Sequence, residues 1–156
     1  MPMVFKVSGL DLAKEHLAKF SESMADNTEL MAEIGTTISE YAANEAFVSQ
    51  GQVYGQPWEP LNSTYAVAKA KKWAGRPMEV QTGAMQDGFG SDYTPTTVVV
   101  RNKVDVNGYN LLTLQQKGTS RGLPPRLILA LNDALKATIL AMVKVVIDTK
   151  LKESKP

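Results

Sequence analysis

Apolar residues recur at three- and four-residue spacing in three stretches of the chain, the pattern of helices that bury one face. We expect these helices over residues 10–24, over residues 28–49 and from residue 132 onward. The expected N-caps are Asp11, either Asn27 or Thr28, and Asn132. The stripe positions are Leu12, Ala13, Leu17 and Phe20 in the first helix, Met31, Ile34, Ile38, Tyr41, Glu45 and Val48 in the second, and Leu135, Ile139, Met142, Val143, Val146 and Ile147 in the third.

Shorter elements lie between the second and third helices. A helix is expected over residues 63–73, with Asn62 or Ser63 as its cap and Tyr65, Val67, Ala68 and Trp73 as its apolar positions. Thr82 precedes a segment that fits one helical turn. The loop before residue 63 is unusually aromatic for a connection, and we expect it to dock against something.

Three segments have the composition of β-strands. Residues 3–7 alternate and predict a short strand, while the β-branched run Thr96–Arg101 predicts a clearer one. Asn107-Gly108 is a hairpin turn signal, although Asn102-Lys103 also fits the turn. The return strand is then "YNLLTLQQ", residues 109–116.

The order of these elements predicts an α+β fold, with a small antiparallel sheet packed against two long helices plus one or two short helices. The 156 residues, 44% of them hydrophobic, fit a single domain over residues 1–150, followed by a polar tail at residues 151–156. No apolar run is long enough to span a bilayer, and the first ten residues lack a signal-peptide pattern. We therefore expect a cytosol-like compartment and no membrane partner.

Charge is unevenly distributed along the chain. Residues 1–58 carry three lysines against eight acids, whereas residues 59–126 carry nine bases against five acids. The last thirty residues carry five bases against three acids, which gives an overall net charge of +1. An acidic end and a basic middle favour head-to-tail association of copies, although solvated helix faces would give the same pattern.

The sequence offers little catalytic chemistry. The chain has no cysteine, and its one histidine, His16, lies between charged residues where a surface position is expected. It contains no phosphate loop, nucleophile elbow or metalloprotease motif. We expect no enzyme activity, no cofactor and no metal site. Of three hypotheses for the function of the chain, a small hydrolase has the least support.

The expected helix over residues 63–73 is basic and carries interleaved aromatic residues. Such a surface is typical of proteins that track a phosphate backbone, so a nucleic-acid-binding module that uses residues 65–76 is the second hypothesis. A solvated helix face explains the same residues, and a membrane-surface helix is disfavoured because the apolar face is small. The candidate cations for a DNA channel are Lys69, Lys71, Lys72, Arg76, Lys117 and Arg121.

Four short motifs lie within "WEPLNSTYAVAKAKKW", "VQTGAMQDGF" and "YNLLTLQQKGTSRGLPPRLILALN". Their residues are Trp58, Pro60, Leu61 and Thr64, then Thr82 and Gly83, then Gln116 and Gly118, then Pro124, Pro125 and Arg126. In this order and spacing the four motifs resemble the phage virion morphogenesis family. Met85, Gln115 and Lys117 stand where the family usually has leucine, histidine and an aromatic residue.

The resemblance implies a structural protein of the virion neck or tail end that acts in tail completion and head-tail joining. Its expected partners are other copies of itself in an oligomeric ring and portal, connector, tail terminator or tail-tube proteins, with transient contact to passing genome DNA. Its expected location is the host cytoplasm during assembly and then the virion. The residues that match the motifs, Pro124 excepted, are the assembly or interface candidates; for Trp58 a core role is an open alternative.

Overall fold

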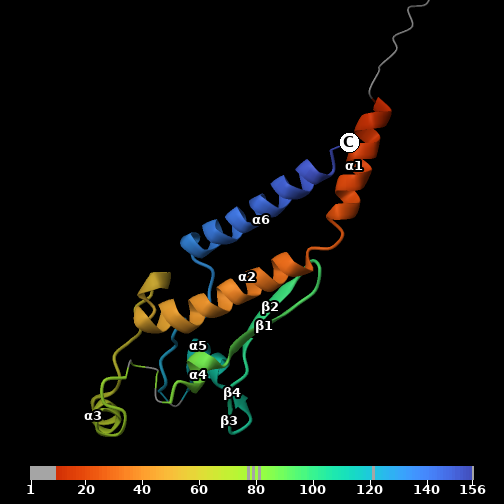
Figure 1. Ribbon diagram of the computed structural model, residues 1–156. Helices are drawn as coiled ribbons and strands as arrows, with labels where there is room; N and C mark the ends of the chain where they lie inside the picture. The colour runs from red at the N-terminus through yellow and green to blue at the C-terminus, as the bar shows by residue number, and fades with distance from the viewer. Residues whose placement is uncertain (1–9, 77, 79, 81, 121, 156) are drawn as a thin grey trace, which may run out of the picture.

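The computed structural model describes residues 10–76, 78, 80, 82–120 and 122–155 (Figure 1). The strand expected at residues 3–7 lies outside this part. The elements in chain order are α1 (Leu10–Ser23), α2 (Thr28–Tyr41), the π-helical turn η1 (Ala42–Ala46), the 3-10 turn η2 (Gln52–Tyr54), α3 (Ser63–Lys72), α4 (Ala84–Asp87), β1 (Phe89–Tyr93), β2 (Val98–Asn102), β3 (Asp105–Val106), β4 (Tyr109–Asn110), α5 (Leu111–Lys117) and α6 (Asp133–Glu153).

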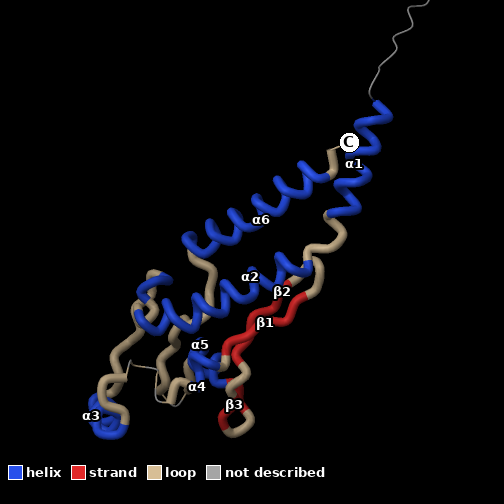
Figure 2. Tube along the Cα trace, viewed as in Figure 1, coloured by secondary structure: helices blue, strands red, loops and turns tan. Residues whose placement is uncertain are grey.

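Helix α2 forms the middle layer of the molecule. It packs on the β1–β2 hairpin with one side and on α6 with another (Figure 2). Gly35 permits the close approach to the hairpin, because a Cβ at this position would collide with the side chain of Ser91. The α+β prediction, with long helices against a small antiparallel sheet, is confirmed.

The second helix deviates from the predicted stripe at its C-terminal end. Its first half buries Leu30 and Ile34, but the π turn then inserts one extra residue. Ala46 and Phe47 consequently face the core and Val48 is 77% exposed, so the stripe position assigned to Val48 was wrong. Asn27 stands at the N-cap position, as one of the two predicted caps, but its side chain makes no capping hydrogen bond. A carboxylate oxygen of Asp26 accepts hydrogen bonds from the backbone and the hydroxyl of Thr28.

The predicted pairing of strands was wrong. The run at residues 98–102 pairs with the preceding β1, in the register Phe89↔Asn102 to Tyr93↔Val98. Asn107-Gly108 does form a tight turn, with both φ angles positive, but it joins only the two-residue strands β3 and β4. Beyond them the expected return strand is helix α5, because Asn110 caps the helix by accepting from the Thr113 N–H.

Helix α1 projects from one end of the molecule and packs against the C-terminal part of α6 (Figure 1). Asp11 lies in its first turn rather than at the cap, where the helix dipole still favours a carboxylate. His16 was expected at the surface but is half-buried at this contact, with Nε2 3.4 Å from the Leu151 carbonyl oxygen. The Lys150 ammonium donates to the carbonyls of Ser23 and Asp26 where the helix ends.

Helix α6 begins where the sequence predicted. The Asn132 side chain accepts from the Leu135 N–H and donates to the Tyr41 hydroxyl and the Val53 carbonyl, at 2.7 and 2.8 Å. The helix continues to Glu153, so the first part of the expected tail is helical. Ile147, which was assigned to the buried stripe, is 36% exposed.

Asn132 ties the start of α6 to the end of α2, and its replacement tests this role. We expect Asn132→Ala to lower the free energy of unfolding by about 2 kcal/mol or more, because the cap and two donated bonds are lost together. Asn132→Asp keeps the cap but not the donors, and we expect a smaller loss. Denaturant unfolding measures both values; equal stability of all three proteins would contradict the role.

Candidate functional site

Trp58 is a core residue rather than an exposed docking residue. Its side chain is 5% exposed, and Nε1 donates to the Leu127 carbonyl at 3.0 Å. The Phe47 ring meets it edge to face, with centroids 5.6 Å apart and planes at 86°. The aromatic loop therefore docks on its own chain, and of the two roles left open by the sequence the structure supports the core role.

The turn after Trp58 leads directly into α3. Pro60 and Thr64 are exposed and Leu61 is half-buried. The Asn62 side chain accepts from the Thr64 N–H at 2.9 Å, which confirms Asn62 as the cap. The Asn62 cap therefore fixes the position at which helix α3 begins.

The third and fourth motifs are joined by hydrogen bonds. Arg126 is 2% exposed; its backbone N–H donates to the Gln115 carbonyl, and its guanidinium donates to the Gln115 side chain and to the Glu59 carbonyl. The Gln116 side chain accepts from the Leu129 N–H at 2.9 Å. These bonds fasten α5 to the extended segment that leads into α6.

Gly118 makes the return of this segment possible. Its φ is +68°, and a Cβ there would lie 2.6 Å from the Leu123 carbonyl oxygen and 2.9 Å from the Pro125 nitrogen. The Leu123 carbonyl accepts from the Thr119 N–H at 2.9 Å, which closes the loop. A residue with a side chain would therefore be strained here in both backbone angle and space.

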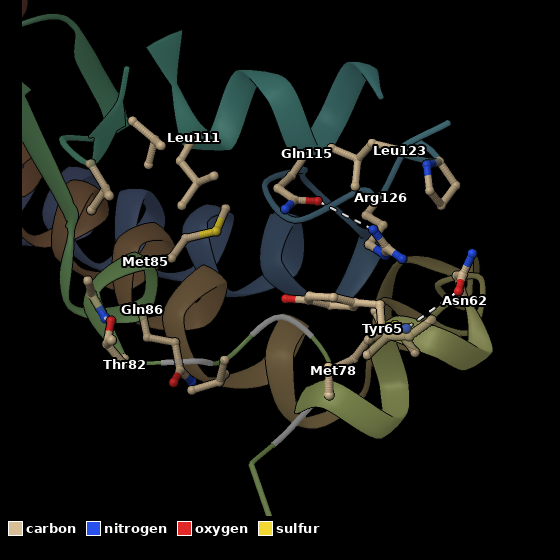
Figure 3. A pocket seen from close by; sticks show the side chains of 18 of the residues that line it. Asn62, Tyr65, Met78, Thr82, Met85, Gln86, Leu111, Gln115, Leu123 and Arg126 are labelled. Atoms are coloured by element: carbon tan, nitrogen blue, oxygen red, sulfur yellow. Dashed lines mark hydrogen bonds between the residues drawn. The ribbon is translucent and has the colours of Figure 1, made fainter. Parts of the chain in front are cut away.

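A groove of about 860 Å³ opens where these motifs meet (Figure 3). Tyr65 from α3 and Met85 from α4 point into it from opposite sides. Its wall is mainly apolar, and Arg126 is the only charged residue among the described lining residues. The predicted candidates that line it are Leu61, Thr64, Thr82, Gly83 and Arg126. Trp58, Pro60, Gln116, Gly118 and Pro125 do not line it.

The sequence did not identify most of the apolar wall. Met78, Val80, Leu111 and Leu123 come from loops and from a segment predicted as a strand. Val80, Met85 and Leu112 belong, with Trp58, to the buried apolar cluster at this end of the molecule. The turn at Thr82 was a usable signal, because its hydroxyl accepts from the Ala84 N–H as predicted for a helix start.

The basic candidates are not equivalent. Lys69 is 5% exposed and donates to the Arg76 carbonyl at 2.9 Å, so its assignment to a DNA-facing surface was wrong. Lys71, Lys72, Arg76 and Lys117 are exposed, and Lys72 Nζ lies 4.6 Å above the ring of Trp73. Arg121 lies outside the described residues.

No set of three or more histidine, cysteine, aspartate or glutamate side chains in the described part of the chain could hold a metal ion. None of its helices is long and apolar enough to cross a membrane. The lining of the groove is mainly apolar, with hydrogen-bonding side chains such as Asn62, Gln115 and Arg126 among it.

A family model described as the phage virion morphogenesis family matches residues 10–108, from α1 to the β3–β4 turn. The chain belongs to this family. No curated protein and no solved structure matches it. The matched residues include the first two motifs and most of the residues that line the groove. The match supports a role in the phage virion or in its assembly. A morphogenesis family also favours a structural role over catalysis.

Removal of the Trp58 side chain tests its role as the anchor. We expect Trp58→Phe to lose about 1–2 kcal/mol of stability with the indole hydrogen bond, and Trp58→Ala about 3–5 kcal/mol. Trp73→Phe is the matched control, since Trp73 is half-buried outside this cluster. Denaturant unfolding measures the stability of the three variants. An equal loss of stability in Trp58→Phe and Trp73→Phe would contradict the role of Trp58 as the anchor.

Gly118→Ala tests the tight return of the loop. We expect it to cost about 1–3 kcal/mol, because both the positive φ and the Leu123 carbonyl oppose a Cβ. Gly108→Ala separates the two effects: its φ is +79° but open space surrounds it. Thermal unfolding of both variants should show the larger loss for Gly118→Ala, and the reverse order would be inconsistent with the crowding.

Proposed function

We propose that the protein completes the phage tail and joins it to the head as an oligomeric ring at the virion neck or tail end. Family membership supports a virion role, and the large exposed surface of the single copy supports assembly. Portal, connector, tail terminator or tail-tube proteins are the partners at the two faces of such a ring.

The exposed surface is the observation that carries the proposal. The single chain exposes 10,728 Å², whereas a folded monomer of its 17.0 kDa mass is expected to expose about 7,700 Å². Nine residues of fully unfolded chain would expose about 1,500 Å², so residues 1–9 do not account for the difference whatever their conformation. The part of the excess exposed area that residues 1–9 do not explain is enough for contact with two neighbours in a ring.

The surface charges favour contact between unlike faces. Helix α2 exposes Glu29, Glu33 and Glu40 at helical spacing. Helix α3, at the lower left of Figure 1, exposes Lys71 and Lys72. Opposite charges on different faces suit heterologous contact, which closes into a ring when the rotation between neighbours allows it.

Nucleic-acid binding has less support than the sequence alone gave it. With Lys69 buried, α3 presents two exposed lysines, and Lys72 lies against Trp73. A single copy would then make few phosphate contacts and bind weakly. Contact with genome DNA in the lumen of a ring remains part of the proposal.

Assembly in the presence of phage components tests this function. Sedimentation of the purified protein, alone and with isolated tails, should show oligomers or association with tails. Electron microscopy of particles made without the protein should show heads and tails that fail to join. Normal joining without the protein, together with a strict monomer that ignores tails, would overturn the proposal.

A further inference from the structure

Helix α1 forms an arm with two large apolar residues that have little cover in its own chain. Leu12 and Leu17 are 55% and 66% exposed. Ala13, Leu17 and Phe20 are spaced by four and three positions, which places them on one side of the helix; Ala13 is exposed and Phe20 is half-buried. The helix contacts the C-terminal part of α6, and its first turns extend past that end (Figure 1).

The groove described above lies at the other end of the molecule. In Figure 1, α1 is at the upper right, whereas α3, α4 and α5, which supply the walls of the groove, are at the lower left. Elements this far apart in one view are also far apart in space. The arm of a molecule in this conformation therefore cannot fill the groove of the same molecule.

We propose that the groove of one copy binds the α1 arm of a second copy, an inference that rests on the ring assembly proposed above. An amphipathic helix that lays its apolar side in an apolar groove is a common mode of recognition. The charges around the two surfaces also match: residues 10–27 carry four acids against two lysines, whereas the helices that supply the groove walls, α3, α4 and α5, expose three lysines, Lys71, Lys72 and Lys117, against one acid, Asp87.

The exposed area is consistent with this contact. An arm that is mostly exposed in one copy and an open apolar groove in the next contribute to the excess surface of the single chain, and both are covered by one contact. When each copy places its arm in the groove of the next copy and receives an arm from the copy before it, the contact is heterologous. Repeated contacts of this kind generate a closed ring or an open helical row.

A second apolar surface competes for the arm. Leu140 and Leu151, 67% and 42% exposed, lie on one side of α6 together with Ile147. Helix α6 is apolar over much of its circumference, so a neighbour can cover it too. The groove is favoured for α1 because it is concave and its wall helices α3 and α5 carry exposed lysines. Binding of α1 to the α6 surface is an explicit outcome of the experiment.

Matched substitutions in α1 measure whether the arm holds copies together. We expect Leu17→Gln to weaken self-association at least tenfold, as measured by sedimentation equilibrium of the full chain or by its retention in assembled tails. Ala18→Gln, at an exposed position on another side of the same helix, should change it less than twofold. Circular dichroism and thermal unfolding of both variants check that the fold is kept.

Single cysteines then identify where the arm binds. The chain has no native cysteine, so a short bismaleimide linker joins only the engineered positions. A mixture of Ala13→Cys, on the same side of α1 as Leu17, with Val106→Cys, at an exposed residue of the groove, should give a covalent dimer. A mixture of Ala13→Cys with Leu140→Cys should not. The same mixtures are tested in assembled tails, where a template aligns the copies.

The outcomes separate this inference from the proposed function. Cross-linking of position 13 to position 106 with loss of association in Leu17→Gln supports both. Oligomers or tail-bound protein that link position 13 to position 140, or that Leu17→Gln leaves intact, overturn the arm-in-groove contact and leave the ring. A protein that never associates with itself or with tails overturns both.

Discussion

The hydrogen bond from the Trp58 indole to the Leu127 carbonyl joins the two halves of the chain at the point where its core is formed. Before Trp58 lie the long helix and its π turn, and around Leu127 the chain leaves α5 on its way to α6. Phe47 and Ile128, both fully buried, pack beside this bond. Val80 and Met85 belong to this cluster and Met78 and Leu111 pack against it, and all four also line the groove, so the shape of this part of the site depends on the cluster.

Polar side chains hold the irregular parts of the molecule in place. Gln115, Gln116 and Arg126 bind backbone groups or each other across the gap between α5 and the extended segment. Asn102 does the same between the hairpin and α4, where its side chain donates to the Met85 carbonyl. Backbone groups without a regular partner need such bonds when they are buried. The apolar wall is therefore positioned by polar contacts that lie behind it.

The sequence predicted the elements whose signals are local. Helix starts at Asn62 and Asn132 followed from side chains that bond to nearby backbone, and the turn at Asn107-Gly108 followed from two residues that accept a positive φ. The prediction failed where contacts between distant segments determine the structure: β1 is glycine-containing and gains its place by pairing with β2, and Lys69 is buried by the fold around α3. The sequence did not predict the groove: it named five of the lining residues as assembly candidates, but the apolar wall is assembled from segments without periodicity.

The three acceptors around the Lys150 ammonium have a geometric consequence. The carbonyls of Ser23 and Asp26 and the side chain of Asn27 surround one cation at the junction of α1 and α2. This cation sets the angle at which the first helix leaves the body of the molecule. If that helix reaches the next copy, the angle fixes the rotation from subunit to subunit, and hence the number of subunits needed to return to the start. One lysine at a helix end would then determine the circumference of the assembly.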